Sequence, residues 1–140
     1  MKTQIIGSRL LLPVLFILLG GAALFFFSGP QSSGGHAEAI QRIAPATYMQ
    51  EISRETHLLL DVRTPEEFAG GYITGAVNIP VQSLASRLSE IPRDQPIVIY
   101  CRSGNRSALA AEILADAGYS TVYDMGGIQA WQAQGLPVTR

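Results

Sequence analysis

The amino-acid sequence predicts an α/β protein with a central, mostly parallel sheet of about five strands flanked by helices. Short apolar runs alternate with segments of helical spacing over residues 40–140. Residues 97–100 are apolar without interruption, as expected of a central strand that is buried on both faces. Ahead of this single domain, residues 10–27 carry no charged or hydrogen-bonding side chain, which predicts an N-terminal transmembrane helix.

The first half of the domain is expected to hold two helices and two strands. A proline precedes residues 46–53 and suits the first turn of a helix there. Three leucines at 58–60 predict a buried strand that ends at Asp61. Residues 64–68 open a helix, because a capping threonine is followed by a proline and two first-turn acids. Residues 76–79 predict a short strand, which the next proline ends.

The second half of the domain repeats this alternation. Residues 81–91 carry apolar side chains at helical spacing, and the strand at 97–100 follows them. Residues 108–118 are rich in strong helix formers and end in a glycine suited to a helix C-terminus. A last strand is expected at 121–124 and a last helix at 128–134. This alternation is what a parallel sheet with crossover helices requires.

The only cysteine of the chain lies between a predicted strand and a predicted helix. Cys101 is followed by a loop of polar and basic residues: Arg102, Ser103, Gly104, Asn105, Arg106 and Ser107. A sulfur anion at the start of a helix faces free N–H groups and the positive end of the helix dipole, and two arginines add to that field. Such surroundings lower the pKa of a cysteine, whereas an inert buried cysteine lacks them. The loop therefore predicts a nucleophilic thiolate, with Gly104 letting the backbone curl around it.

Four segments resemble, in order, the signatures of the rhodanese family of sulfurtransferases. They are residues 61–68, 71–80, 101–107 and 126–131. One departure is Tyr72, where the family usually carries a histidine. The resemblance implies a rhodanese-like domain over residues 40–140. It also implies that the cysteine takes a sulfane sulfur from a donor such as thiosulfate, becomes a persulfide, and passes the sulfur to cyanide or a thiol. The loop amides would stabilise the negative charge, and the arginines would receive the anionic donor.

Two other functional classes share this architecture. Four residues separate Cys101 from Arg106, whereas cysteine-dependent phosphatases of the related fold have five, and the shorter loop suits a sulfur atom. Arsenate reductase chemistry is weakened because the chain has no resolving cysteine. A persulfide relay or sulfur-sensing module, with little turnover of small donors, remains open. Intact Cys101 and Arg106 do not separate an enzyme from a relay.

Further residues are expected to lie near the loop. Arg63 is a candidate border of the donor pocket, although Asp61 and Arg63 more commonly tie loops together at such a position. Gly126 and Gly127 are expected to allow a tight turn close to the loop. Trp131 is expected to be a core anchor and not a substrate platform.

Composition limits the partners and cofactors. The chain has 10 Lys and Arg and 11 Asp and Glu; the first 35 residues hold Lys2 and Arg9 and no acid, which leaves 8 basic against 11 acidic residues. A mildly acidic domain argues against nucleic acid as a partner. With one cysteine, an outside acceptor must discharge a persulfide, and that acceptor could be a small thiol, cyanide or a protein thiol. No cofactor is expected, and the separation of His36 from His57 predicts no metal site.

The apolar segment at 10–27 predicts where the protein lies in the cell. As a helix it would rise about 27 Å, close to the hydrocarbon thickness of a bilayer. It is longer than the apolar region of a signal peptide, so an uncleaved anchor is favoured over a signal peptide. Lys2 and Arg9 then place residues 1–9 in the cytoplasm. The predicted protein is single-pass in the inner membrane of a bacterium, with a flexible linker at 28–39 and a periplasmic catalytic domain.

Overall fold

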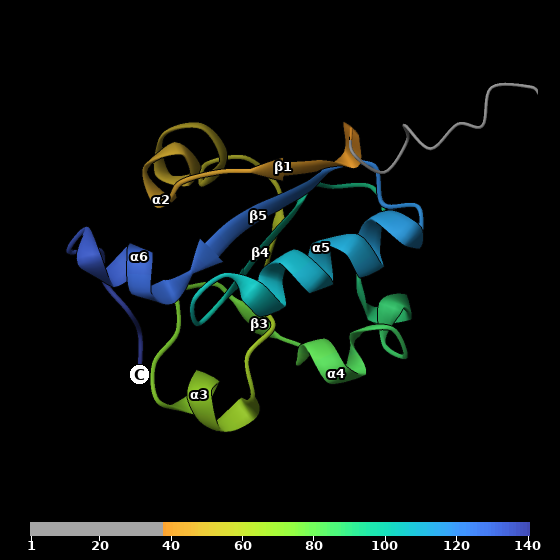
Figure 1. Cartoon of the computed structure of the whole chain (residues 1–140). Coiled ribbons are helices and arrows are strands. Elements are labelled where there is room, and N and C mark those ends of the chain that lie inside the picture. The colour runs from red at the N-terminus through yellow and green to blue at the C-terminus, as the bar shows by residue number, and fades with distance from the viewer. Residues whose placement is uncertain (1–37) are drawn as a thin grey trace, which may run out of the picture. The chain divides into compact units, whose positions relative to one another are not determined.

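The computed structural model describes residues 38–140 of the 140-residue chain (Figure 1). The expected cytoplasmic segment 1–9, the anchor 10–27 and nearly all of the linker 28–39 therefore lie outside the described residues. The last two residues of that linker, Glu38 and Ala39, are helical. Within residues 38–140, no helix is both long and apolar enough to cross a membrane.

Five strands form a single sheet in the order β1-β5-β4-β2-β3, and every neighbouring pair is parallel. The strands are β1 (Ile40–Arg42), β2 (Leu58–Asp61), β3 (Val77–Asn78), β4 (Ile97–Cys101) and β5 (Val122–Gly127). The predicted parallel sheet of five strands flanked by helices is thus confirmed. Because β4 occupies the centre, its carboxyl end opens where functional sites collect in parallel sheets.

Helices cover both faces of the sheet, and β4 supplies side chains to each. All five β4 residues are buried, and they alternate between two hydrophobic clusters. Ile97, Ile99 and Cys101 face α4 (Val81–Leu84) and α5 (Asn105–Asp116). On the opposite face, Val98 and Tyr100 join side chains from the π-helical turn η1 (Tyr48–Ile52) and α6 (Ile128–Ala133). Figure 1 shows α5 lying in front of the sheet, next to β4.

The strand β1 has no counterpart among the elements expected from the sequence. It is three residues long, it pairs with β5 at the edge of the sheet, and only Ile40 is apolar. Such a segment is too short to show a period of two. It becomes a strand because the β5 backbone offers it hydrogen-bonding partners.

Two expected helices differ in the structure. The segment 81–91 does not form one helix but α4 followed by the 3-10 turn η2 (Leu88–Glu90). The hydroxyl groups of Ser83 and Ser86 donate to the carbonyls of Pro80 and Ser83, and such local bonds compete with a regular helix. The first helix, expected at 46–53, is a short α2 (Pro45–Thr47) that continues as the π-helical turn η1.

Helix α5 begins three residues earlier than expected, inside the cysteine loop. Gly104 is its N-cap with a left-handed φ of 113°, so Arg106 and Ser107 lie in the first helical turn. The helix α3 (Pro65–Ala69) has the expected Thr64 cap. The elements that surround Cys101 are thus the end of β4, the start of α5, and α3 together with the β5-to-α6 junction.

Candidate active site

Cys101 is the last residue of β4 and is 1% exposed. The pairing of β4 with β5 shifts register just here, because Ile99 pairs with Asp124 whereas Cys101 pairs with Gly127. Three residues of β5 therefore match two of β4, which is a β-bulge. The bulge places the two glycines of β5 beside the cysteine, as the sequence predicts.

The loop after Cys101 wraps its backbone around the sulfur. The N–H of Gly104 donates to Cys101 Sγ at 3.0 Å. The Ser107 hydroxyl is fully buried and lies 2.9 Å from the carbonyl oxygen of Gly104 and 3.2 Å from that of Gly126. These contacts hold the loop closed between β5 and the first turn of α5, so the sulfur faces several backbone N–H groups.

The net effect of these surroundings is to lower the pKa of the Cys101 thiol. Burial by itself raises the pKa, and hydrogen bonding from the backbone N–H groups of Gly104, Ser107 and Ser103 outweighs it. The Ser107 hydroxyl adds to the lowering. Such an environment is typical of a nucleophilic cysteine and not of an inert core residue.

Gly127 is required for the loop to approach β5 this closely. A Cβ atom at this position would lie 2.5 Å from the Arg102 carbonyl oxygen and 2.7 Å from Ser103 Cα. The φ of Gly127 is −114°, which any residue adopts, so the requirement is steric and not conformational. The carbonyl of Arg102 also accepts the N–H of Gln129, at 3.3 Å, which joins the loop to α6.

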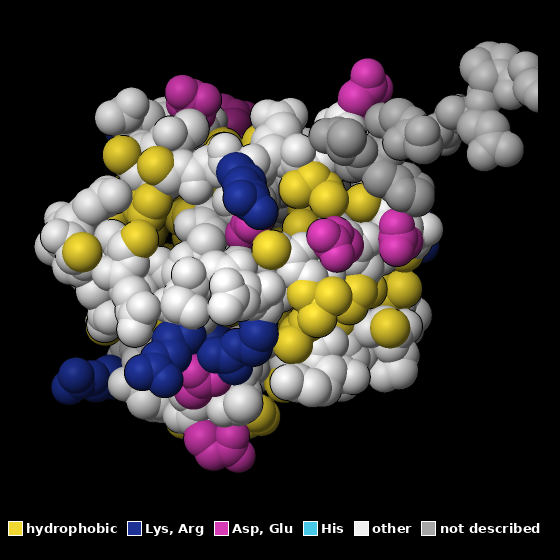
Figure 2. All heavy atoms as spheres, in the orientation of Figure 1, with side chains coloured by type: hydrophobic (Ala, Val, Ile, Leu, Met, Phe, Trp, Pro, Cys, Tyr) yellow, Lys and Arg dark blue, Asp and Glu magenta, His cyan; other side chains and the backbone are white. Residues whose placement is uncertain are grey.

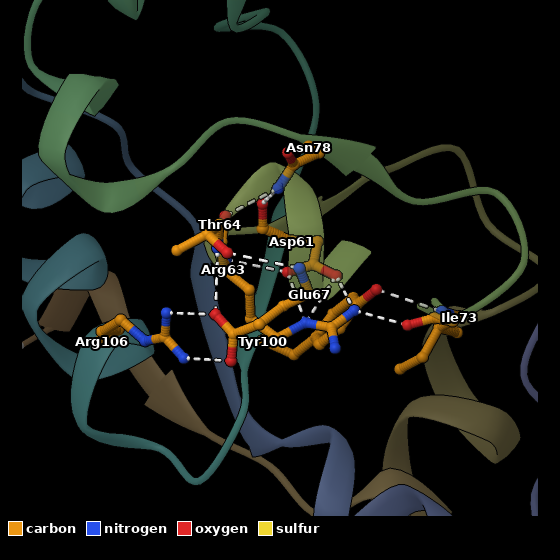
Figure 3. Close-up of polar contacts among 9 residues, drawn as sticks. Asp61, Arg63, Thr64, Glu67, Ile73, Asn78, Tyr100 and Arg106 are labelled. Carbon is orange, nitrogen blue, oxygen red and sulfur yellow. Dashed lines mark hydrogen bonds and ion pairs between the residues drawn. The ribbon is translucent and has the colours of Figure 1, made fainter. Parts of the chain in front are cut away.

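The sequence led us to expect that Arg106 is free to receive an anion. In the structure Arg106 is instead paired with Glu67 of α3 (Figure 3). Its two terminal nitrogens donate to the two carboxylate oxygens at 2.6 and 2.9 Å. Glu67 also accepts the N–H of Thr64, whose hydroxyl accepts the Glu67 N–H, in a capping box. The Arg106 bond lowers the pKa of Glu67 to about 2, while partial burial works against it. Glu67 therefore ties α3 to the cysteine loop.

A buried ion pair joins Asp61, at the end of β2, to Arg63. Arg63 is 5% exposed, and its Nη2 donates both to Asp61 Oδ2 at 2.6 Å and to the Gly71 carbonyl at 2.7 Å. Figure 3 shows this pair beside Tyr100, whose hydroxyl accepts the Ile73 N–H at 3.1 Å. The structure thus ties loops together through Asp61 and Arg63, and it also places Arg63 on the wall of a cavity.

Two cavities flank the cysteine loop. One, of about 330 Å³, is bordered by Arg63, Glu67 and Arg102, together with α6 and residue Arg140. The other, of about 350 Å³, lies on the side of β5 and is bordered by Ser103 and Asn105. Among the sequence-predicted loop residues, Ser107 is turned into the protein, whereas Arg102, Ser103 and Asn105 are exposed.

Three residues of the site are absent from the sequence-based predictions. Glu67 forms an ion pair with Arg106. The Tyr100 hydroxyl accepts the N–H of Ile73. The Asn78 amide donates to the carbonyls of Asp61 and Arg63, both at 2.9 Å. Only the capping pattern at 64–67 points to Glu67 in the sequence.

Trp131 is buried and donates to the Pro137 carbonyl at 2.9 Å, as a core residue. Over residues 38–140 no cluster of three His, Cys, Asp or Glu side chains could hold a metal ion.

The chain is similar to known sulfurtransferases in sequence. It is 48% identical over 85 residues to a sulfurtransferase of Allochromatium vinosum, which covers 60% of this chain and 79% of that protein. It is 35% identical over 94 residues to the thiosulfate sulfurtransferase GlpE of Pseudomonas putida, which covers 66% of this chain and 86% of that protein. Both alignments leave part of this chain unmatched.

Comparison of the fold with solved structures also finds a related protein. The crystal structure of a rhodanese-related protein from Thermoplasma volcanium superposes with a TM-score of 0.64 at 36% identity, covering 71% of this chain and 97% of that one. The family described as Rhodanese-like domain matches residues 44–134, which include every loop, helix and strand that surrounds Cys101. The chain therefore belongs to the rhodanese-like domain family.

Proposed function

We propose that this protein is a sulfurtransferase in which Cys101 carries a sulfane sulfur from thiosulfate or a persulfide donor to a thiol or cyanide. The observation that carries the proposal is the position of Cys101 Sγ, which accepts the Gly104 N–H at 3.0 Å in a loop whose amides lower its pKa. The relatives named sulfurtransferase support the same chemistry. A lowered thiol pKa and a loop of N–H donors suit a thiolate nucleophile and an anion bound to it.

The reaction proceeds in two steps that share the cysteine. The Cys101 thiolate attacks the outer sulfur of thiosulfate, the sulfur–sulfur bond of the donor breaks, and its electron pair leaves on sulfite. The product is a Cys101 persulfide, whose terminal negative charge the loop N–H groups stabilise. Cyanide or a thiolate then attacks the terminal sulfur, and the electron pair of the breaking bond returns to Cys101. With no second cysteine in the chain, the acceptor must come from outside.

Mass spectrometry of the intact full-length chain tests this proposal. Incubation with thiosulfate should add the mass of one sulfur atom, and cyanide should remove it and release thiocyanate. Cys101→Ser should gain nothing under the same conditions. Ser103→Ala, which keeps the loop backbone and removes only an exposed hydroxyl, should load as the unaltered protein does.

Other outcomes separate the remaining classes. Loading from a small organic persulfide but not from thiosulfate would make the protein a persulfide relay fed by another thiol. No loading from either donor would contradict sulfur transfer. Hydrolysis of an aryl phosphate that depends on Cys101 would then favour the phosphatase alternative.

We also propose that residues 10–27 anchor the domain in the inner membrane, with the domain on the periplasmic side. The support is the length of the uncharged run and the position of Lys2 and Arg9 before it. Carbonate extraction of membranes should leave the chain in the pellet, and protease added to spheroplasts should digest residues 38–140. A chain released by carbonate, with its first residues missing by mass, would instead establish a cleaved signal peptide.

A further inference from the structure

A groove beside the cysteine loop carries two arginines that form no ion pair within residues 38–140. It lies between α3, the loop, α6 and the C-terminal segment. Figure 2 shows arginine side chains gathered on this side of the molecule around an acidic one. We propose that Arg102 and Arg140 bind the carboxylate of a small anionic thiol or persulfide in this groove, with the sulfur of that molecule directed to Cys101. The inference rests on the proposed function and names the class of its thiol substrate.

Two acidic side chains near the groove pair with other arginines. Asp61 binds Arg63, and Glu67 binds Arg106. Glu66, which also borders the groove, keeps its negative charge, because hydrogen bonds from its own N–H and from the Thr64 hydroxyl lower its pKa. Across residues 38–140, the side chains of Arg102 and Arg140 have no ion-pair partner. Two unpaired arginines beside one unpaired acid, Glu66, leave the groove an excess of positive charge for an anionic ligand.

Arg140 is held at the groove by backbone pairing. The neighbouring residue Thr139 forms an antiparallel bridge with Tyr72, in which the two N–H···O bonds measure 2.9 and 2.8 Å. The hydroxyls of Thr139 and Thr74 also lie 2.7 Å apart. The segment that carries Arg140 is thus fixed next to Gly71, whose carbonyl binds Arg63.

The remaining groove lining suits an organic ligand better than an inorganic ion. Gln129 and Gln132 lie three residues apart on α6, and their exposed amides border the same groove. Ile128 and Val138 provide apolar surface for a carbon chain. A volume of about 330 Å³ is at the small end of ligand pockets, which fits a small molecule and not a protein segment.

Two aromatic disulfides of different charge test the groove without requiring sulfur transfer. Dithiobis(nitrobenzoate) carries carboxylates, whereas dithiodipyridine is neutral. The Cys101 thiolate attacks one sulfur of either reagent, the disulfide bond breaks, and the coloured aryl thiolate leaves with the electron pair. Stopped-flow absorbance then gives a second-order rate constant for each reagent with the full-length chain.

The expected result is a selective loss in Arg140→Gln. The rate with the carboxylated reagent should fall by about two- to fivefold, the range expected for an exposed ion pair, whereas the rate with dithiodipyridine should not change. Arg140→Lys should retain most of the rate. Arg42→Gln is the matched control, because Arg42 is an arginine 82% exposed on the other side of the loop, and neither rate should change. High salt should reduce the effect of Arg140→Gln.

The experiments distinguish failure of carboxylate binding in the groove from failure of the proposed sulfur transfer. Equal slowing of both reagents by Arg140→Gln, or slowing of neither, would overturn the proposal that the groove binds a carboxylate. Absence of thiosulfate loading in the unaltered protein would overturn the proposed function, and the disulfide rates would still decide the groove. If both hold, the loaded protein should pass its sulfur to 3-mercaptopropionate faster than to 2-mercaptoethanol, and Arg140→Gln should abolish that preference.

Discussion

The lowered pKa of the Cys101 thiol depends on single backbone N–H groups of its own loop. Burial opposes the charged form of the thiol, and hydrogen bonds from the amides of Gly104, Ser107 and Ser103 restore it. Sequence reasoning attributes part of this effect to Arg102 and Arg106, but Arg106 is bonded to Glu67. The main source of anion stabilisation is therefore the loop backbone.

Ser107→Ala tests this at the level of one hydroxyl. The rate of Cys101 alkylation by iodoacetamide follows the thiolate, so in the unaltered protein it should rise with pH through a midpoint below the ordinary thiol value of 9.0. Removing the Ser107 hydroxyl removes one contribution that lowers the pKa, so the midpoint should move to higher pH. Ser103→Ala should leave it in place, because only the amide of Ser103 contributes. An unchanged midpoint in Ser107→Ala would contradict this role.

Glu67→Gln tests the ion pair that joins α3 to the loop. Glutamine can keep the capping box but loses the pair with Arg106, so the free energy of unfolding should fall by about 1 kcal/mol at pH 7. Urea denaturation of both proteins measures the difference, with Glu66→Gln as the control that keeps the pair.

The same ion pair predicts a pH dependence with a defined sign. The pKa of Glu67 is lowered to about 2 from 4.5, so its stabilisation is complete above pH 4.5. It is lost as the pH falls through about 2, where the carboxylate becomes protonated in the folded protein. The stability difference between the unaltered protein and Glu67→Gln should therefore shrink over this window. A difference that stays constant down to pH 2 would show that the charge of Glu67 is not its source.

At the scale of elements, the site is a junction of β4, β5 and α5. The bulge in β5 brings Gly127 opposite Cys101, and α5 begins inside the loop, so its first turn supplies N–H groups to the sulfur. The cysteine side chain itself packs in the cluster between the sheet and α5. The loop is thus shaped by the two elements on either side of it as much as by its own residues.

Gly127→Ala tests this junction. The added methyl group would overlap the Arg102 carbonyl, so the loop must move away from β5. The free energy of unfolding should fall by about 1–3 kcal/mol, and alkylation of Cys101 should slow. Gly135→Ala is the control, because its φ of 73° is strained for alanine while nothing lies within 4 Å of the added atom. Gly135→Ala should lose stability and keep its alkylation rate; equal rates in both variants would exclude the proposed contact.

At the scale of the whole molecule, a buried polar network joins segments that are distant in sequence. Arg63 connects Asp61 of β2 to Gly71, and Tyr100 of β4 connects to Ile73. These contacts fasten the stretch after α3 onto the sheet. The same stretch pairs through Tyr72 with Thr139, so the network also positions the C-terminal segment that borders the groove.

Arg63→Met tests the contribution of this network to folding. The substitution leaves Asp61, which is fully buried, without its partner, so the free energy of unfolding should fall by about 3–5 kcal/mol. Arg87→Met breaks an exposed pair with Glu90 and should cost far less stability in the same urea titration. Similar losses in the two variants would contradict a special role for the buried pair.

The sequence by itself determined the fold class, the place of Cys101 at the end of a buried strand, and the cap of α3. Each depends on neighbouring residues: an apolar run, a capping threonine with its proline, or a loop of residue types suited to an anion. The close approach of Gly127 to the loop was also expected, because paired glycines at the end of a strand favour it.

Only the tertiary structure decided which arginines are neutralised and which remain free. Glu67 lies 39 residues from Arg106, and Arg140 reaches the groove through a backbone bridge between Tyr72 and Thr139. Strand β1 also exists because β5 accepts it at the sheet edge. Such pairings depend on where the fold brings distant segments together, and local pattern and propensity carry no information about that distance.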